Sequence, residues 1–538
     1  MKWNRITAMF TALMLGISLS GCDMVEQFLD RSNADNKNKV ALTPEQEAKR
    51  YDLTVMEETV TALKDRWTMP NQEESIQRDI EWLIHELDEA AAIYSRSQLD
   101  YYADWNNPAL EAMYDKAYED YYIASELICW AFCNGYSKSA YPELFESYIE
   151  EDWLAYYITI SLSRLKSYAK SDSSEYGDML DSYYEISNDT DLSEDEIELQ
   201  CAQIYLDTLA AYDTSDCLYD YYSRDYTAAD ISALYEMLVE ELVPLYDTLY
   251  ETLVESDTYD KIAEADLVVE DPFATILQYA PKISSEIAES AEKLVNEKLY
   301  CVAEGDDCYD GCYTVTFPNE QSAMIYHYRG GDYYDLYSAI HEFGHFHSDW
   351  RDTTPLYLQE NCIDIAEVQS QGMSMLYTAF YDEIYGEYAD YLKLAALYDL
   401  VDSVVCGFAI GEFEIRVMQD LEHLKAKDVV KIFHEIAEEC GISYSLSEVT
   451  HLYEQPGYYI SYGVSAMAAL QIYAQMQEDF DDGLALYEAI AGVSSVDGKY
   501  QLMDAMEHCG FSSLFEADTI ADMMEQVELS LQQSSIRQ

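Results

Sequence analysis

The sequence predicts a mainly α-helical protein with one small β-sheet near its middle. Three observations support this. Apolar and aromatic residues recur at three- and four-residue spacing through most of the chain, prolines are few, and glycines with strand-like alternation gather around residues 308–335. The 538 residues, 49% of them hydrophobic, allow a substantial core. The expected order is a helical first half, the small sheet and a helical second half.

The first residues, 1–21, are expected to be a signal peptide. Two basic residues precede an apolar run from Ile6 to Leu19, which is short for a membrane span. The Leu-Ser-Gly-Cys that ends at Cys22 resembles a bacterial lipobox, which implies cleavage before Cys22 and lipid attachment to it. An ordinary secretory signal with an incidental cysteine is the alternative. No later segment is expected to span a bilayer, so we expect an extracytoplasmic protein anchored to the cell membrane by acyl chains.

Residues 22–42 are expected to be a tether, because the second half of this segment is polar and charged. A helical N-terminal domain is expected over residues 43–300. Its first helix opens with Thr43 as N-cap, a proline next, and Gln46 in place to close a capping box.

The second domain is expected over residues 301–538. Alternation in "YTVTF" (313–317) and "AMIYHY" (323–328) predicts two short strands. Two glycines then make the turn into the next helix, for which Asp332 is the expected N-cap.

The chain is strongly acidic, with 30 basic against 104 acidic side chains and a formal net charge of −74. This charge argues against nucleic acid as a partner, because phosphate would be repelled. It is compatible with cationic peptides as substrates, and a solvated, aggregation-resistant surface is the simpler explanation.

Twelve cysteines are present, and eleven remain if Cys22 is lipidated. Cys301, Cys308 and Cys312 lie close enough in sequence to form one disulfide. A zinc cluster at Cys308 and Cys312 is the alternative, but no second cysteine pair stands nearby to complete it.

The stretch "SAIHEFGHFHSDW" contains a possible metal site. Positions four apart on an α-helix lie about 40° from each other around its axis, so His341 and His345 can present two imidazoles to one ion. Glu342 can reach a metal-bound water and act as its general base, as in hydrolytic zinc sites. His347 points away from that face and is expected to support the site or lie at the surface.

Zinc hydrolases need a third protein ligand and an open position for water. The following helix, in "CIDIAEVQSQGMSMLYTAF", offers Asp364 and Glu367 three residues apart on one face, and either could complete the set. Gly344 carries no side chain between the two histidines, which leaves room for another element to approach them.

"DLYSAIHEFGHFHS" followed by "IDIAEVQSQ" resembles the thimet oligopeptidase and oligoendopeptidase F family of zinc metallopeptidases. Its members carry H-E-[FL]-G-H on one helix and a glutamate ligand roughly 25 residues on, inside E-x-x-S. The resemblance implies that Glu367, 26 residues after His341, is the third ligand and that Asp364 has a supporting role. Other glutamate zincins use a shorter gap, which would select Asp364. Ser374 departs from the family, whose members usually have an acidic residue there.

A second stretch, "HLYEQPGYYISYG", matches a downstream motif of the same family at His451, Tyr458 and Tyr462. Fixed O–H and imidazole N–H donors opposite the zinc would stabilise the negative charge of a tetrahedral intermediate. Tyr459 is the substitute if the match is displaced by one residue. A tyrosine-rich loop packed on a helix is the plainer alternative.

The resemblance also implies two helical halves around a deep channel, and a strand at "AMIYHY" whose edge pairs with extended substrate. His327 on that strand could face the cleft or be buried. The expected function is a Zn²⁺ metalloendopeptidase that cuts short unfolded oligopeptides, with a preference for basic ones, outside the cytoplasm. A non-catalytic peptide-binding lipoprotein of the same fold and a zinc exopeptidase are the alternatives.

Overall fold

The computed structural model describes residues 42–149, 151–162, 165, 175–187, 189–210, 219, 221–265 and 267–533. The expected signal peptide and Cys22 lie outside the described residues, as does nearly all of the expected tether. Within the described residues the chain is mainly α-helical, with one three-stranded sheet. The mainly α fold class is therefore confirmed.

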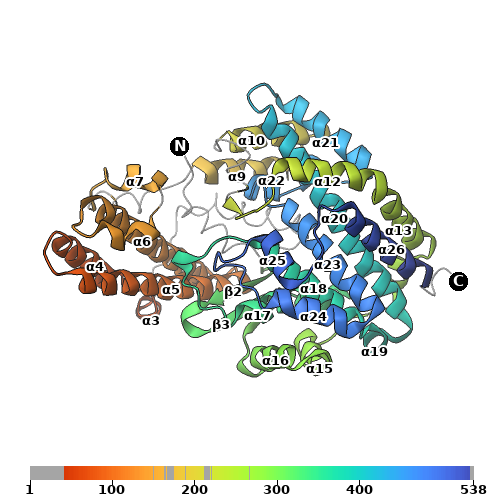
Figure 1. The fold of residues 1–538 in the computed structure, drawn as a ribbon, viewed down its shortest axis with the longest axis horizontal. Coiled ribbons are helices and arrows are strands. Elements are labelled where there is room, and N and C mark those ends of the chain that lie inside the picture. Colours follow the sequence, from red (N-terminus) through yellow and green to blue (C-terminus); the bar gives the residue numbers. More distant parts are fainter. Residues whose placement is uncertain are drawn as a thin grey trace.

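The first group of helices lies at one end of the molecule (Figure 1). Its members are α3 (Pro44–Glu47), α4 (Leu53–Arg66), α5 (Glu73–Ala103), α6 (Pro108–Lys138) and α7 (Glu151–Tyr157).

The expected capping box at the first helix forms. The backbone N–H of Gln46 donates to the Thr43 hydroxyl, and the backbone N–H of Thr43 donates to Gln46 Oε1. The helix has only four residues, Pro44–Glu47. It stops before Arg50, whose guanidinium turns in to make two hydrogen bonds of 2.8 and 2.6 Å to the Asp120 carboxylate. Asp52 then caps the next helix by accepting from Thr54 N.

A second group of helices completes the first half of the chain: α9 (Glu175–Ser187), α10 (Glu194–Leu209), α12 (Ala228–Glu241), α13 (Val243–Glu255), α14 (Thr258–Glu264), α15 (Pro272–Ile283) and α16 (Ser285–Glu297). Their buried residues belong to the same apolar core as the second half of the chain, a core that extends from Tyr183 to Leu531. Helices α4, α5 and α6 have a core of their own. The main core contains residues from both sides of residue 300, and the domain boundary there stays a prediction.

The sheet consists of β1 (Tyr300–Ala303), β2 (Cys312–Phe317) and β3 (Ser322–Tyr328) in the order β1-β3-β2. The two strands expected from alternation are confirmed as β2 and β3, and β1 is an addition. The expectation that β3 offers an edge to substrate is wrong. This strand is central, parallel to β1 and antiparallel to β2, so both of its edges are already paired.

The sheet lies between the first helices and the second half of the chain, next to α17 (Tyr334–Asp349), as expected (Figure 1). Strands β2 and β3 both pack against α17, and β1 and β2 contact α5. The N-cap of α17 is Tyr333 rather than the expected Asp332, one residue earlier, whose carboxylate accepts a hydrogen bond of 2.7 Å from Tyr334 N at the start of the helix. Among the described residues, β2 is therefore the edge strand beside the histidine helix.

The remaining helices are α18 (Ile363–Thr378), α19 (Tyr381–Tyr385), α20 (Ala389–Gln419), α21 (Ala426–Cys440), α22 (His451–Glu454), α23 (Ile460–Glu478), α24 (Phe480–Ala491), α25 (Leu502–Cys509) and α26 (Ala517–Gln533). Helix α18 packs against both α17 and α23. Every residue of α18 from Asp364 to Thr378 is buried.

One stretch of the described residues, Tyr381–Gln419, is long and apolar enough to cross a membrane by length and composition. The expectation that no later segment passes this test is therefore wrong. However, 78% of its most apolar window is buried inside the protein, as in the core helix of a soluble domain. The deep channel implied by the resemblance stays a prediction.

Candidate active site

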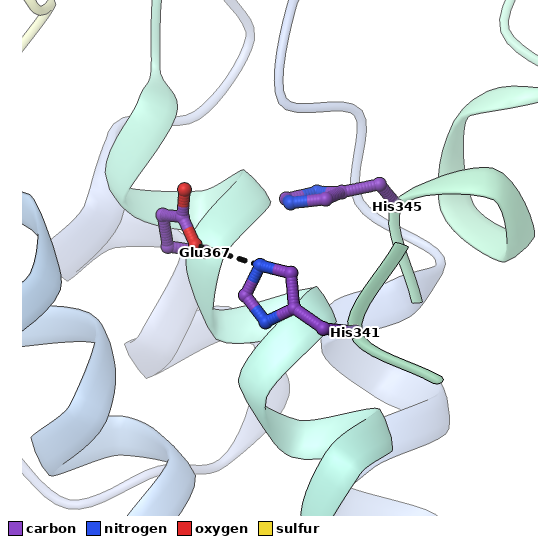
Figure 2. Close-up of side chains that lie close together, drawn as sticks. All are labelled: His341, His345 and Glu367. Carbon is purple, nitrogen blue, oxygen red and sulfur yellow. Dashed lines mark ion pairs between the residues drawn. The ribbon is translucent and has the colours of Figure 1, made fainter. Parts of the chain in front are cut away.

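Three side chains from two helices point toward one another (Figure 2). His341 and His345 come from α17, with ring centroids 5.1 Å apart, and Glu367 comes from α18. One ligand atom from each of the three lies within 4.8 Å of the others. The Nε2 atom of His341 is 3.6 Å from Oε2 of Glu367. The His341 side chain is 22% exposed, so the cluster is accessible at this histidine.

Gly344 explains how α18 comes so close to the two histidines. A Cβ atom at this position would lie 2.6 Å from Ser370 Cα and 2.8 Å from the carbonyl oxygen of Gln369, both in the backbone of α18. Any side chain would therefore separate the two helices. The glycine between the histidines lets the backbone of α18 approach, one turn from Glu367.

Burial sets the protonation of the cluster. It lowers the pKa of His341 to about 4 and that of His345 well below its usual value, so both imidazoles are neutral at pH 7. A neutral imidazole offers the lone pair that a metal ion needs. Burial also raises the pKa of Glu367 to about 7, although hydrogen bonds from Tyr458 and Ser370 act in the opposite direction.

Glu342 lies beside the cluster, 2% exposed, and is held by strand β2. The Thr314 hydroxyl donates to Oε2 of Glu342 at 2.8 Å and is 3.1 Å from its backbone carbonyl oxygen. Burial raises the pKa of Glu342 well above its usual value. Sequence reasoning missed Thr314. The only available signal is that it alternates with buried residues in β2 and so faces the less covered side.

The second oxygen of Glu367 has its own partner. Oε1 accepts a hydrogen bond of 2.9 Å from the Tyr458 hydroxyl, while Oε2 accepts one of 3.2 Å from Ser370. Ser374, one turn further along α18, is 1% exposed and donates to the carbonyl oxygen of Ser370. Among the described residues, hydroxyl groups rather than another carboxylate therefore support this glutamate.

The three residues of the downstream motif lie together. The His451 ring stacks on Tyr458 with centroids 5.1 Å apart, and Tyr462 meets Tyr458 edge-on at 5.1 Å. Burial lowers the pKa of His451 to about 4, so its ring is neutral with one N–H to donate. Tyr459 contacts the rings of His451 and Tyr462, and its hydroxyl also interacts with Tyr444. Through the Tyr458–Glu367 bond, this aromatic group adjoins the histidine cluster.

Asp364 lies apart from the histidine cluster. Its carboxylate is completely buried, and Oδ2 accepts a hydrogen bond of 2.8 Å from the Tyr226 hydroxyl. Oδ2 also lies 3.4 Å from Nε of Arg224. No sequence signal paired Asp364 with residues nearly 140 positions away, so these partners were missed.

The other histidines singled out by the sequence lie outside the cluster. His347 is buried, with Nδ1 2.9 Å from the Ser290 hydroxyl. His327 is also buried, and its Nε2 is 2.9 Å from the carbonyl oxygen of Asp335. The ten cysteines within the described residues are all free, Cys301, Cys308 and Cys312 among them, so the expected disulfide there is absent.

Comparisons with known proteins identify the fold. No family model and no curated sequence matches the chain. A solved structure provisionally described as an oligoendopeptidase F matches with a TM-score of 0.66 and 14% identity, covering 94% of this chain and 99% of that one. PZ peptidase A with an inhibitor matches at 0.65 and 13%, covering 94% and 100%. An M32 carboxypeptidase from Deinococcus radiodurans matches at 0.54 and 12%, covering 84% and 99%. The chain thus has the fold of oligoendopeptidase F and PZ peptidase, as the sequence motifs implied.

Proposed function

We propose that this protein is a zinc metalloendopeptidase that hydrolyses short oligopeptides outside the cytoplasm. The observation that carries the proposal is the convergence of His341, His345 and Glu367, with the Glu342 carboxylate held beside them by Thr314. Two neutral imidazoles, a carboxylate and an adjacent general base are the composition of a hydrolytic zinc site. A protein that only binds peptides has no need for Glu342.

The donor set fits a zinc ion. Ligand atoms on a tetrahedral zinc with bonds of about 2.1 Å lie about 3.4 Å apart. The 3.6 Å between His341 Nε2 and Glu367 Oε2 is close to that value, and the 4.8 Å limit for the whole set requires only small side-chain movements. His341, His345 and Glu367 would hold the ion, leaving its fourth position for water or substrate. Two histidines and one carboxylate can also hold Fe²⁺, so metal analysis is part of the test.

A zinc ion held by these residues would supply Lewis-acid polarisation of a water molecule and of the scissile carbonyl. In the proposed mechanism Glu342 takes the proton of the attacking water and passes it to the leaving nitrogen. The Thr314 hydroxyl binds Oε2 of Glu342, so that Oε1 remains the oxygen for the proton.

The neutral His451 and the hydroxyl of Tyr462 are the proposed donors to the substrate oxygen as it gains negative charge. Tyr458 has a different proposed role, because its hydroxyl donates to Oε1 of Glu367. There it fixes the orientation of the carboxylate that is proposed to bind the metal.

Extended substrate is proposed to lie along β2 rather than β3. Among the described residues β2 pairs only with β3, which leaves its outer edge for a peptide backbone. The same strand positions Glu342 through Thr314, so a peptide added to this edge runs past the general base. Recognition of backbone rather than side chains suits a broad range of oligopeptides.

The test uses the zinc-loaded protein and a pool of internally quenched peptides with both ends blocked. We expect internal cuts by the wild type and a loss of about 100- to 10,000-fold in Glu342→Ala, with the metal still bound. Glu58→Ala, an exposed glutamate of α4, is the control and should cleave normally. Peptide binding without cleavage by the wild type would instead support the binding-protein alternative.

An exopeptidase is the second candidate, because one structure of the same fold is a carboxypeptidase. The same peptides with free and with blocked ends separate the two. An endopeptidase cuts both sets, whereas an exopeptidase cuts only the free ones.

The location and charge preference complete the proposal. A lipid anchor at Cys22 predicts that the full chain fractionates with membranes and that Cys22→Ser releases it. The net charge of −74 predicts faster cleavage of basic than of acidic peptides, and this difference should shrink as salt is added.

A further inference from the structure

One buried cation is not used by the proposed mechanism. Arg224 lies between α10 and α12, in the half of the chain that carries none of the proposed catalytic residues. Its side chain has an exposed fraction of 0%. A buried guanidinium is costly unless it is paired, so its partners indicate why it is there.

Arg224 connects two helices of the site. Its Nε is 3.4 Å from Oδ2 of Asp364 on α18, and its Nη2 donates a hydrogen bond of 2.8 Å to the Ser461 hydroxyl on α23. Guanidinium has a rigid fork of donors, so one side chain can hold both partners at a fixed separation.

Tyrosine rings of the same segment surround this arginine. The Arg224 Cζ atom lies 4.6 Å from the ring centre of Tyr222, 5.2 Å from that of Tyr219 and 5.8 Å from that of Tyr226. Tyr226 also donates to the same Asp364 oxygen, and Tyr222 packs edge-on against Tyr458 at 6.0 Å. The segment therefore contacts Asp364 on α18 and Tyr458 in the aromatic group of the site.

The two attachment points flank one hydrogen bond of the site. Asp364 precedes Glu367 by three residues on α18, and Ser461 follows Tyr458 by three residues. Tyr458 and Glu367 are themselves joined by the bond of 2.9 Å between the Tyr458 hydroxyl and Glu367 Oε1. Each end of this bond thus lies about one helical turn from a group that Arg224 holds.

We propose that Arg224 is a positioning residue for the metal site. It fixes α18 against α23 through Asp364 and Ser461, and thereby sets the Tyr458–Glu367 hydrogen bond that orients the third ligand. This inference rests on the proposed metal-binding role of Glu367.

Stability alone does not explain the pair. Replacing a buried ion pair by apolar residues of similar size is often neutral or stabilising, whereas removing one partner leaves an uncompensated charge. The test variant is therefore the double substitution Arg224→Met with Asp364→Leu. The matched control is Arg50→Met with Asp120→Leu, which removes an arginine–aspartate pair on α6, outside the main core, where the Asp120 side chain is only 2% exposed.

Zinc affinity, measured by competition with a chelator, is the first readout and needs no activity. We expect the Arg224/Asp364 double variant to bind zinc about 10- to 100-fold more weakly. This is the typical loss when a residue that orients a metal ligand is removed. The control pair should leave the affinity within about twofold. Wild-type affinity in the folded double variant would overturn the inference. If that variant does not fold, Arg224→Lys replaces it, because a lysine keeps the charge but cannot hold Asp364 and Ser461 together.

A double-mutant cycle separates positioning from a general loss of structure. Tyr458→Phe removes the hydrogen bond to Glu367, so the Arg224/Asp364 substitutions should weaken zinc binding much less in that background than in the wild type. Full additivity would overturn the inference. A wild type that binds zinc with this coupling but cuts no peptide would overturn the proposed endopeptidase function alone. Unaltered zinc affinity in the double variant of an active enzyme would overturn this inference alone.

Discussion

Helices α5 and α18 differ in what they bury. Along α5, buried residues such as Ile80 and Leu87 recur at helical spacing, and acidic residues cover the outer face. Helix α18 has no outer face, since all residues from Asp364 to Thr378 are buried, two carboxylates and two amides among them. Buried polar groups cost free energy unless each finds a partner. Helix α5 buries one carboxylate, Asp88, and one amide, Gln98, within a mainly apolar face, whereas α18 carries more buried polar groups than stability alone would select.

The largest effect is expected from Glu367→Ala on α18. Removing a residue that only orients a ligand typically weakens metal binding by about 10- to 100-fold. Losing the ligand itself should cost more, so zinc affinity should fall by about a thousandfold or more and cleavage should be lost. Chelator competition and metal analysis measure this. Glu81→Ala on the exposed face of α5 is the control, with a change in unfolding free energy of at most about 0.5 kcal/mol. Zinc binding unchanged by Glu367→Ala would remove α18 from the site.

The converse change is Leu87→Ala on α5. This side chain is 0% exposed, so its truncation leaves a cavity and should lower the free energy of unfolding by about 3 kcal/mol. Zinc affinity and kcat of the folded protein should stay the same, because the core of α4, α5 and α6 is separate from the main core. Denaturant titration and chelator competition on one preparation give both values. A drop in zinc affinity would show that the two regions are coupled.

Much of α5 and α17 could be predicted from the sequence, because their patterns are local. The periodicity of apolar residues predicts the helices, and the spacing of His341, Glu342 and His345 predicts one metal-binding face. The spacing to Glu367 was informative only through the family resemblance, since Asp364 fits a helix face equally well. The structure places Asp364 with Arg224 instead.

The partners of α18 could not be predicted, because they come from distant parts of the chain. Tyr226 and Arg224 precede Asp364 by nearly 140 residues, and no periodicity relates them. The central place of β3 was missed for a similar reason. Strand β1, which pairs with β3 in parallel, has only four residues. This is too few to show a clear alternation of apolar and polar residues in the sequence. Arg50, just after α3, likewise pairs with Asp120, which lies 70 residues further along the chain.

A smaller effect is expected at the contact between α17 and α18. Gly344→Ala places a Cβ 2.6 Å from the backbone of α18 at Ser370, so the helices must separate at a cost of about 1–3 kcal/mol. Zinc affinity should fall as well, because Glu367 moves with α18. Gly492→Ala is the matched control, since its new Cβ meets no atom nearer than 3.4 Å. Equal effects from the two substitutions would contradict the close approach described for Gly344.

The smallest effect is expected from Thr314→Val on β2, which removes the donor to Glu342 and keeps the shape. A hydrogen bond to a charged group contributes about 1.5 kcal/mol or more, so kcat should fall about tenfold with zinc affinity unchanged. Thr316→Val is the matched control, because Thr316 lies two residues on along the same face of β2. If both variants keep full kcat, Thr314 does not position the general base.

The assignment of His341, His345 and Glu367 as metal ligands is tested by X-ray absorption at the zinc edge of the zinc-loaded wild type, with Glu367→Ala beside it. This ligand set predicts nitrogen and oxygen neighbours at about 2.0–2.2 Å and no sulfur shell, with one protein oxygen lost in the variant. Sulfur at about 2.3 Å would instead indicate cysteine ligands. The first candidate would be Cys312, which lies on β2 two residues before Thr314. That result, or a spectrum that Glu367→Ala leaves unchanged, would contradict the assignment of His341, His345 and Glu367 as the metal site.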